Sequence, residues 1–416
     1  MPRFIFRFLT DIRPLRTSPD FRRLWVGQTL SGIGSQMARV TVAVQIYDIS
    51  HSSFAVGLAG IFAVVPALLF SLMGGVLIDS CDRKKIIRFT SCILTLVALT
   101  FAYQAWAGTG SVALLYLLTS LQSALMAIDG PARRSVIARL LPSDQIPAAS
   151  SLLQLSFQVS LLTGPVVGGI IIARAGFSVA YLIDALSFIL SLYAVLRMNA
   201  MPVENPVVRP GLSSLTAGAR FICQDPVLSA VLLTDIFAMV LAMPRAIIPA
   251  ITEQQFSGGP ELAGLFFAAP AVGGLAAAIF SGPLSSVRRQ GLATLFCALL
   301  WGLSSVALAV AHDSYTALIF LAIGGAADMI GGVFRATLVQ TRTPDNMRGR
   351  VNSLASLIST GGPSLGDFRA GLTASLLSPA ASALAGGVAC IACTSILALK
   401  LPSVIRFKTS ESDLKG

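Results

Sequence analysis

Twelve apolar stretches dominate this 416-residue chain. Each has about twenty residues or more, the length that an α-helix needs to cross the hydrocarbon core of a bilayer. Because backbone polar groups that face lipid must be satisfied within the segment, we expect a bundle of helices; alternating β-barrel patterning does not occur. The predicted spans are 22–47, 53–79, 86–107, 111–132, 146–173, 177–197, 227–251, 260–284, 291–311, 314–337, 350–377 and 380–400.

The composition supports a lipid-facing surface. Charged residues make up 12% of the chain and hydrophobic residues 55%. Soluble domains carry about a quarter charged residues, so this chain has too few to cover its surface in water. The mean hydropathy of +0.79 agrees with a lipid bilayer as the surrounding medium.

The net charge of +11 follows the predicted topology. If both termini are cytoplasmic, all but four of the 30 Lys and Arg residues lie in the tails or in the connections on the cytoplasmic side. The opposite connections carry Glu253, Glu261 and Asp313. The basic excess is therefore a topology signal, and we expect no nucleic-acid partner. The four exceptions are Arg39, Arg174, Arg245 and Arg369.

Signatures of enzymes and cofactor-binding proteins are missing from the sequence. The six cysteines form no disulfide framework or metal-ligand cluster, and His51 and His312 are lone residues in predicted outside connections. No G-x-x-x-x-G-K-[ST] motif and no redox-cofactor motif occurs. We expect a protein that is not an enzyme, binds no metal and needs no cofactor.

The longest connection divides the spans into six and six. We predict a cytoplasmic tail over 1–21, a bundle over 22–197, a cytoplasmic loop over 198–226, a bundle over 227–401 and a cytoplasmic tail over 402–416. Within the loop, "GLSSLTAGARFICQDP" predicts an amphipathic surface helix.

An internal repeat supports this division. "PARRSVIARLLPSDQIPAASSL" (131–152) aligns with "VFRATLVQTRTPDNMRGRVNSL" (333–354) at an offset of 202 residues. Arg133 falls on Arg335 and Pro142 on Pro344, and each copy ends one span and begins the next.

Two motifs carry a resemblance to a known family. The connection after the second span, "GGVLIDSCDRKKIIRF", has Gly75, Leu77, Asp79, Arg83 and Lys84 in the pattern G-x-L-A-D-R-x-G-R-K of the major facilitator superfamily. Ser80 and Asp82 depart from this pattern. The fifth span adds "SLLTGPVVGG" (160–169), which is similar to the family's antiporter motif except that Ser160 replaces a glycine.

The resemblance implies an all-α integral membrane protein with twelve transmembrane helices in two pseudo-symmetric six-helix bundles. It also implies alternating access, in which charged residues close the cytoplasmic side and release it again. The alternative is that the charged connection only fixes topology. The expected cytoplasmic gate comprises Gly75, Asp79, Asp82, Arg83, Lys84, Asp129 and Arg133, and the expected antiporter hinge comprises Gly164, Pro165, Gly168 and Gly169.

Charged residues inside the spans are candidates for substrate and proton sites, because each is costly in lipid and usually faces an aqueous cavity. Asp235 would lie roughly 12 Å inside its span and is our first candidate for proton coupling, followed by Asp184 and Asp328. Structural pairing, for instance of Asp367 with a neighbouring arginine, is the alternative.

The position at which the family often carries a coupling arginine is Thr119 here. Candidates for binding an anionic substrate are Arg39, Arg245 and Arg369.

Within the superfamily the chain resembles the branch of bacterial siderophore exporters. The features that carry this are "DFRRLW", "GGVLIDSCDRKKII", "SSLTAGARFI" and "QTRTPDNMRGRVNSL". The resemblance implies a monomer in the bacterial inner membrane that exports a catecholate siderophore to the periplasm in exchange for protons. Export of a macrolide-like or other amphiphilic drug is the alternative.

Overall fold

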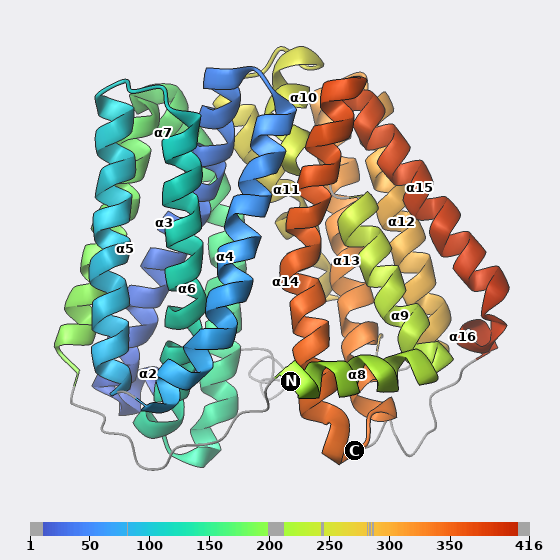
Figure 1. Ribbon diagram of the computed structural model, residues 1–416, viewed down its shortest axis with the longest axis horizontal. Helices are drawn as coiled ribbons and strands as arrows, with labels where there is room; N and C mark the ends of the chain where they lie inside the picture. Colours follow the sequence, from blue (N-terminus) through green and yellow to red (C-terminus); the bar gives the residue numbers. More distant parts are fainter. Residues whose placement is uncertain are drawn as a thin grey trace, which may run out of the picture. The chain divides into compact units, whose positions relative to one another are not determined.

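The computed structural model of the chain consists of helices joined by short connections (Figure 1). It describes the backbone of residues 11–80, 82–198, 212–242, 245–280, 282, 284 and 287–406, without the side chains of 72–80, 138 and 212–215. No strand occurs in these ranges, which confirms the predicted all-α class.

The first half of the chain forms long helices joined by short connections. Asp82 begins α5 and Ser111 begins α6 as N-caps, because their side-chain oxygens accept backbone N–H groups of the first turn. The helices are α2 (Arg13–Thr17), α3 (Pro19–Ser50), α4 (Ser53–Ser80), α5 (Arg83–Trp106), α6 (Val112–Leu140) and α7 (Ile146–Leu196), with a 3₁₀ turn η1 (Ser143–Gln145).

The second half follows the same plan with an interrupted seventh span. Figure 1 shows α8 running crosswise at the end of α14, where Gly218 packs on the backbone of Arg350. The elements are α8 (Leu212–Gln224), α9 (Pro226–Ile236), η2 (Phe237–Leu241), η3 (Arg245–Ile247), α10 (Ile248–Gln254), α11 (Pro260–Ile279), α12 (Gln290–Val310), α13 (Ser314–Arg342), α14 (Asp345–Leu376), α15 (Pro379–Lys400) and α16 (Pro402–Arg406).

Each of the twelve predicted spans falls on helical segments. The fifth and sixth share α7, which changes direction at Gly176, where φ is 81° and only glycine is unstrained. By length and hydropathy, 9 segments of the described chain qualify as membrane spans, and α7 is counted there as one. Counting α7 as two spans and adding the more polar helices α3 and α14 gives a number consistent with the predicted twelve.

The internal repeat is visible in the helix bounds. Helices α6 and α13 both have 29 residues, and α13 begins and ends 202 residues after α6. The spacing equals the offset of the sequence repeat, so the two copies occupy equivalent helices.

The chain divides into two compact units, residues 1–42 with 65–209, and residues 43–64 with 210–416. Residues 43–64, the end of α3 and the start of α4, thus pack with the second unit, although the predicted bundles divide only at the central loop. Glycines permit this contact: a Cβ at Gly57 would lie 2.6 Å from the backbone oxygen of Asp367.

Both units expose large apolar side chains along their helices, as a lipid-facing surface requires. Examples with exposures between 50% and 67% are Leu69, Phe89, Leu96, Tyr103, Leu117, Leu186, Leu190, Ile279, Phe296, Ile319 and Ile396.

Glycine determines the closest helix contact of the second unit. A Cβ at Gly325 of α13 would collide with the carbonyl oxygen of Pro270 in α11, and a Cβ at Gly273 with that of Ala322. These obstacles are backbone atoms that no side-chain rotation can remove. The two helices therefore pack backbone against backbone.

We predict that Gly325→Ala lowers the stability of the purified protein by about 1–3 kcal/mol or more, because the added methyl group forces α11 and α13 apart. Thermal unfolding in detergent measures the effect. Gly332→Ala on the same helix is the matched control, since its Cβ would make only an ordinary contact with Arg335 at 3.6 Å. Equal melting temperatures for the two variants would contradict the packing argument.

Candidate functional site

A buried ion pair lies at the centre of the first unit. The Arg133 side chain on α6 donates from Nε to Asp129 Oδ2 at 2.5 Å, one helical turn earlier. Arg133 is 4% exposed and Asp129 8%. Because a buried charge is costly unless it is paired and hydrogen-bonded, the remaining donors and acceptors of this pair also need partners.

Neighbouring helices supply those partners. Arg133 donates to Ser191 Oγ of α7 at 3.1 Å and to Ser91 Oγ of α5 at 2.8 Å, and Thr90 Oγ1 donates to Asp129 Oδ1 at 2.7 Å. One polar cluster thus connects α5, α6 and α7. The predicted gate residues Asp129 and Arg133 do come together, and the partners found for them belong to their own unit.

The charged residues that follow the second span make hydrogen bonds with the adjacent helix α5 and with the end of α7. Asp82 caps α5 by accepting the backbone N–H of Lys84 at 2.8 Å. Lys84 Nζ donates to the carbonyl oxygens of Leu196, at 3.4 Å, and of Met198, at the end of α7. A cation at a helix C-terminus is favourable. The side chain of Arg83 is half-buried, and its Nε has no hydrogen-bond partner among the described residues. The predictions for Gly75 and Asp79 lie outside the described side chains.

The predicted hinge motif lies where α7 meets α3. A Cβ at Gly164 would lie 2.6 Å from Gln36 Cβ, and one at Gly168 would lie 2.9 Å from Met37 Cγ. Pro165 and Gly169 are buried in the same stretch. Only small residues at these positions allow α3 and α7 to approach this closely; a hinge role remains a prediction.

A charged cluster of three residues occupies the second unit. Arg335 Nη2 of α13 lies 3.1 Å from Asp235 Oδ1 of α9 and 3.3 Å from Asp328 Oδ1 on its own helix. Asp235 is 3% exposed, whereas the Asp328 side chain is 36% exposed. Two predicted proton-coupling residues therefore share one guanidinium group.

The two clusters are built on repeat-related arginines. Arg133 and Arg335 occupy equivalent places in α6 and α13, and each contacts a carboxylate of its own helix. The first cluster has one carboxylate for one guanidinium, and the second has two. Both arginines lie within their helices and not in the connections that follow them.

The seventh span is interrupted between α9 and α10, and α14 supplies polar groups at both ends of the break. Arg369 donates to the carbonyl oxygens of Val240 at 3.2 Å and Leu241 at 2.5 Å, where η2 ends. Asp367 Oδ1 accepts the N–H of Ala246, where η3 begins, at 3.2 Å. These contacts satisfy backbone groups that a continuous helix would pair internally.

The predicted anion-binding arginines are held in different ways. Arg369 also donates to Ser382 O at 3.3 Å, so backbone oxygens engage its guanidinium group. Arg245 is exposed and lies within electrostatic reach of Asp367, in line with the structural-pairing alternative. Arg39 is exposed on α3 of the other unit. Their role toward a substrate remains a prediction.

Asp184 differs from the other acidic residues of the spans. It lies on the second arm of α7 and is 0% exposed, and in the described part of the chain neither carboxylate oxygen has a hydrogen-bond partner. Beside it is Gly34 of α3, where a Cβ would lie 2.6 Å from Asp184 Oδ1.

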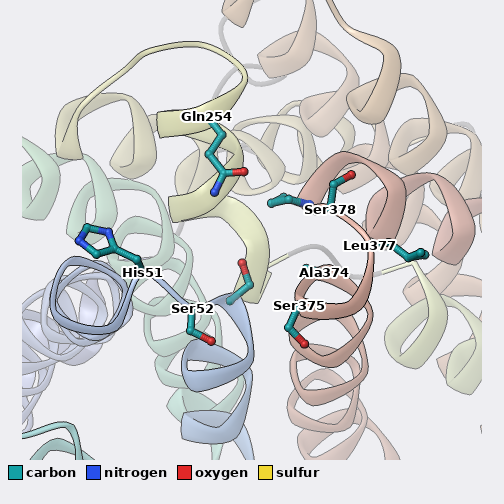
Figure 2. A pocket seen from close by; sticks show the side chains of 9 residues that line it. His51, Ser52, Gln254, Ala374, Ser375, Leu377 and Ser378 are labelled. Atoms are coloured by element: carbon teal, nitrogen blue, oxygen red, sulfur yellow. The ribbon is translucent and has the colours of Figure 1, made fainter.

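A cavity of about 350 Å³ opens in the second unit, at the end remote from α8. Figure 2 shows Gln254 extending from α10 between Ser52 on one side and Ser378 on the other. None of the predicted site residues lines it. Its lining consists of His51, Ser52, Ser53, Gln254, Ala374, Ser375, Leu377, Ser378 and Pro379. Within the described ranges, no three His, Cys, Asp or Glu side chains are arranged to hold a metal ion.

The sequence reasoning missed the partners of the two arginines. Thr90, Ser91 and Ser191 are ordinary polar residues of apolar spans and give no signal of their own. Arg335 itself did give a signal, because it aligns with Arg133 in the internal repeat.

Comparison with known proteins identifies relatives along the whole chain. The model of the transmembrane secretion effector family matches residues 9–414. The enterobactin exporter EntS of Shigella boydii serotype 18 is 25% identical over 401 residues, covering 96% of both chains. EntS of Salmonella typhi is 26% identical over 406 residues, covering 96% of this chain and 97% of the relative.

Solved structures share the fold. A bacterial homologue of the iron transporter ferroportin, in an inward-facing state, superimposes with a TM-score of 0.71 at 17% identity and covers 93% of this chain and 99% of its own. A peptide transporter of the POT family gives a TM-score of 0.76 at 12% identity, covering 94% and 96%.

We predict that Arg133→Met destabilises the protein by about 3–5 kcal/mol, because it leaves Asp129 buried without its counter-charge. Thermal unfolding in detergent measures this loss. The double variant Asp129→Asn with Arg133→Met is expected to regain much of it.

The matched control is Arg348→Met, which breaks an exposed pair with Asp345 and is expected to cost about 0–1 kcal/mol. If Arg133→Met proved no more harmful than Arg348→Met, the cluster would not hold the first unit together.

Proposed function

Because the chain belongs to the transmembrane secretion effector family of the major facilitator superfamily, we propose that it exports a catecholate siderophore of the enterobactin type in exchange for protons. The observation that carries the proposal is the similarity to enterobactin exporters, which extends over 96% of this chain. The multi-pass helical architecture agrees with it. The proposed location is a bacterial inner membrane, with both termini cytoplasmic.

The charge count of the second unit supports proton coupling. One guanidinium group can neutralise only one of the carboxylates of Asp235 and Asp328, both of which it contacts. The second carboxylate can therefore bind a proton without breaking an ion pair. We assign the coupling proton to this cluster of Asp235, Arg335 and Asp328.

Alternating access needs contacts that form and break while the units stay intact. In the proposed cycle, the buried cluster around Arg133 keeps α5, α6 and α7 of the first unit together. The gate at Asp79 and the close α3–α7 contact at Gly164 change between states. Such contacts are individually modest, so binding of a substrate or a proton can shift them.

We predict that iron-starved cells without this gene lose siderophore from the culture medium and retain it, or its breakdown products, in the cytoplasm. Liquid chromatography of both fractions measures the distribution. Restoring the gene on a plasmid is the control. Unchanged secretion in the deletion strain, together with new sensitivity to macrolides or other amphiphilic drugs, would replace the siderophore proposal by drug export.

A second prediction concerns coupling. Asp235→Asn is expected to reduce efflux of enterobactin driven by a pH gradient to background, because Asp328 alone then balances Arg335 and no carboxylate is left to exchange a proton. Proteoliposomes with an imposed pH gradient measure the rate.

Asp345→Asn is the matched control: it removes an exposed carboxylate from an ion pair and should change the rate less than about twofold. An Asp235→Asn variant that still responds to the gradient would place the coupling proton elsewhere.

A further inference from the structure

Asp184 has an environment that the cluster around Arg335 does not explain. It lies in the other unit, and its carboxyl group is completely buried. Neither of its oxygens accepts a hydrogen bond from the residues that the structure describes. An ionised carboxylate in such a place is costly unless a cation or several donors face it.

Within the described residues, no ion pair reaches Asp184. Arg133 of α6 contacts Ser191, two turns further along the second arm of α7, and its guanidinium group is engaged by Asp129, Ser91 and Ser191. Besides Asp184 itself, the second arm of α7 carries no acidic or basic residue between Arg174 and Arg197, and α5 carries none after Arg88. On α3 the next charged residue after Gly34 is Arg39, whose side chain is exposed. The nearby titratable group is Tyr181, one turn earlier, which is buried and stacked on Phe101 of α5 with ring centroids 5.0 Å apart.

Ser187 is the polar neighbour, and its geometry restricts the hydrogen bond that it can make. Its Oγ donates to the backbone oxygen of Asp184 at 2.7 Å, so its only proton is already used. Toward the carboxyl group Ser187 then offers only oxygen lone pairs. While this bond is made, Ser187 does not donate to an ionised carboxylate, which favours the protonated form of Asp184.

The α3–α7 contact closes over this group. A Cβ at Gly34 would collide with Ser187 Oγ and would lie 2.6 Å from Asp184 Oδ1, so both oxygens lie against the glycine. A movement of α3 away from α7 would therefore expose the carboxyl group on this side.

We propose that Asp184 is a second proton-binding site, located in the first unit, which holds its proton while α3 and α7 are closed and releases it when they separate. The proposal deepens the proton coupling of the proposed function and rests on that function for what the proton drives. A proton in this place ties the contact of two helices to pH without any ion pair.

The first test is infrared spectroscopy of the full-length protein in lipid, without substrate. The parent is expected to show the carbonyl band of a protonated carboxylic acid that exchanges slowly in D₂O. Asp184→Asn should lose this band. Asp48→Asn, at an exposed position of α3, and Asp235→Asn, in the other cluster, should keep it. A slowly exchanging band that is the same in Asp235→Asn and in the double variant Asp184→Asn with Asp235→Asn overturns the proposal, because the double variant lacks both proton sites of this account.

The second test is hydrogen–deuterium exchange along α3 and the second arm of α7. Raising the pH should lower protection in the parent by at least about tenfold, because removing the proton creates an unpaired buried charge. Protection in Asp184→Asn should not depend on pH after correction for intrinsic exchange. Equal pH dependence in both proteins contradicts the proposal. Neither test uses a siderophore, so their outcome is separate from the failure of the proposed substrate.

Discussion

The cost of an unpaired charge in a water-poor interior is the constraint on which this structure depends. In each unit, an arginine on a repeat-related helix forms ion pairs with buried carboxylates. Arg133 is matched by one carboxylate and the hydroxyl groups of two neighbouring helices, which gives a complete and closed cluster. Arg335 faces two carboxylates, so its cluster can accept a proton. In this account, the same repeat supplies a rigid element to one unit and a chemically adjustable element to the other.

Buried backbone N–H and C=O groups are also costly when they have no hydrogen-bond partner. Where the seventh span is interrupted, Arg369 and Asp367, two residues apart on α14, satisfy carbonyl and N–H groups that the break leaves open. The close contacts between helices depend on glycines, which have no side chain to hold the backbones apart. Gly325 brings α13 onto the backbone of α11, and Gly164 brings α7 onto α3. A transporter built in this way can keep helices closely packed and still use a few polar contacts to change state.

Much of the fold could be predicted because hydrophobic length and the repeat are local or regular signals. The predicted spans all fall on helices, and Gly176 separates the fifth from the sixth. The pairing of Asp235 with Arg335 could not be read in the same way, because the two residues are 100 positions apart and belong to different spans. The engagement of Arg369 by backbone carbonyl groups depends on a break in another helix. Pro244 and Pro249, both inside one predicted span, were available signs of that break.

The central claim is that one protein couples proton entry to siderophore exit. The most direct measurement is transport of enterobactin by the purified chain in proteoliposomes, with proton movement recorded in the same vesicles. The account predicts that enterobactin moves against its gradient when a pH gradient is imposed, and that enterobactin added alone drives protons in the opposite direction. Movement of enterobactin without any linked proton flux would contradict the account, as would a pH gradient that leaves enterobactin where it was.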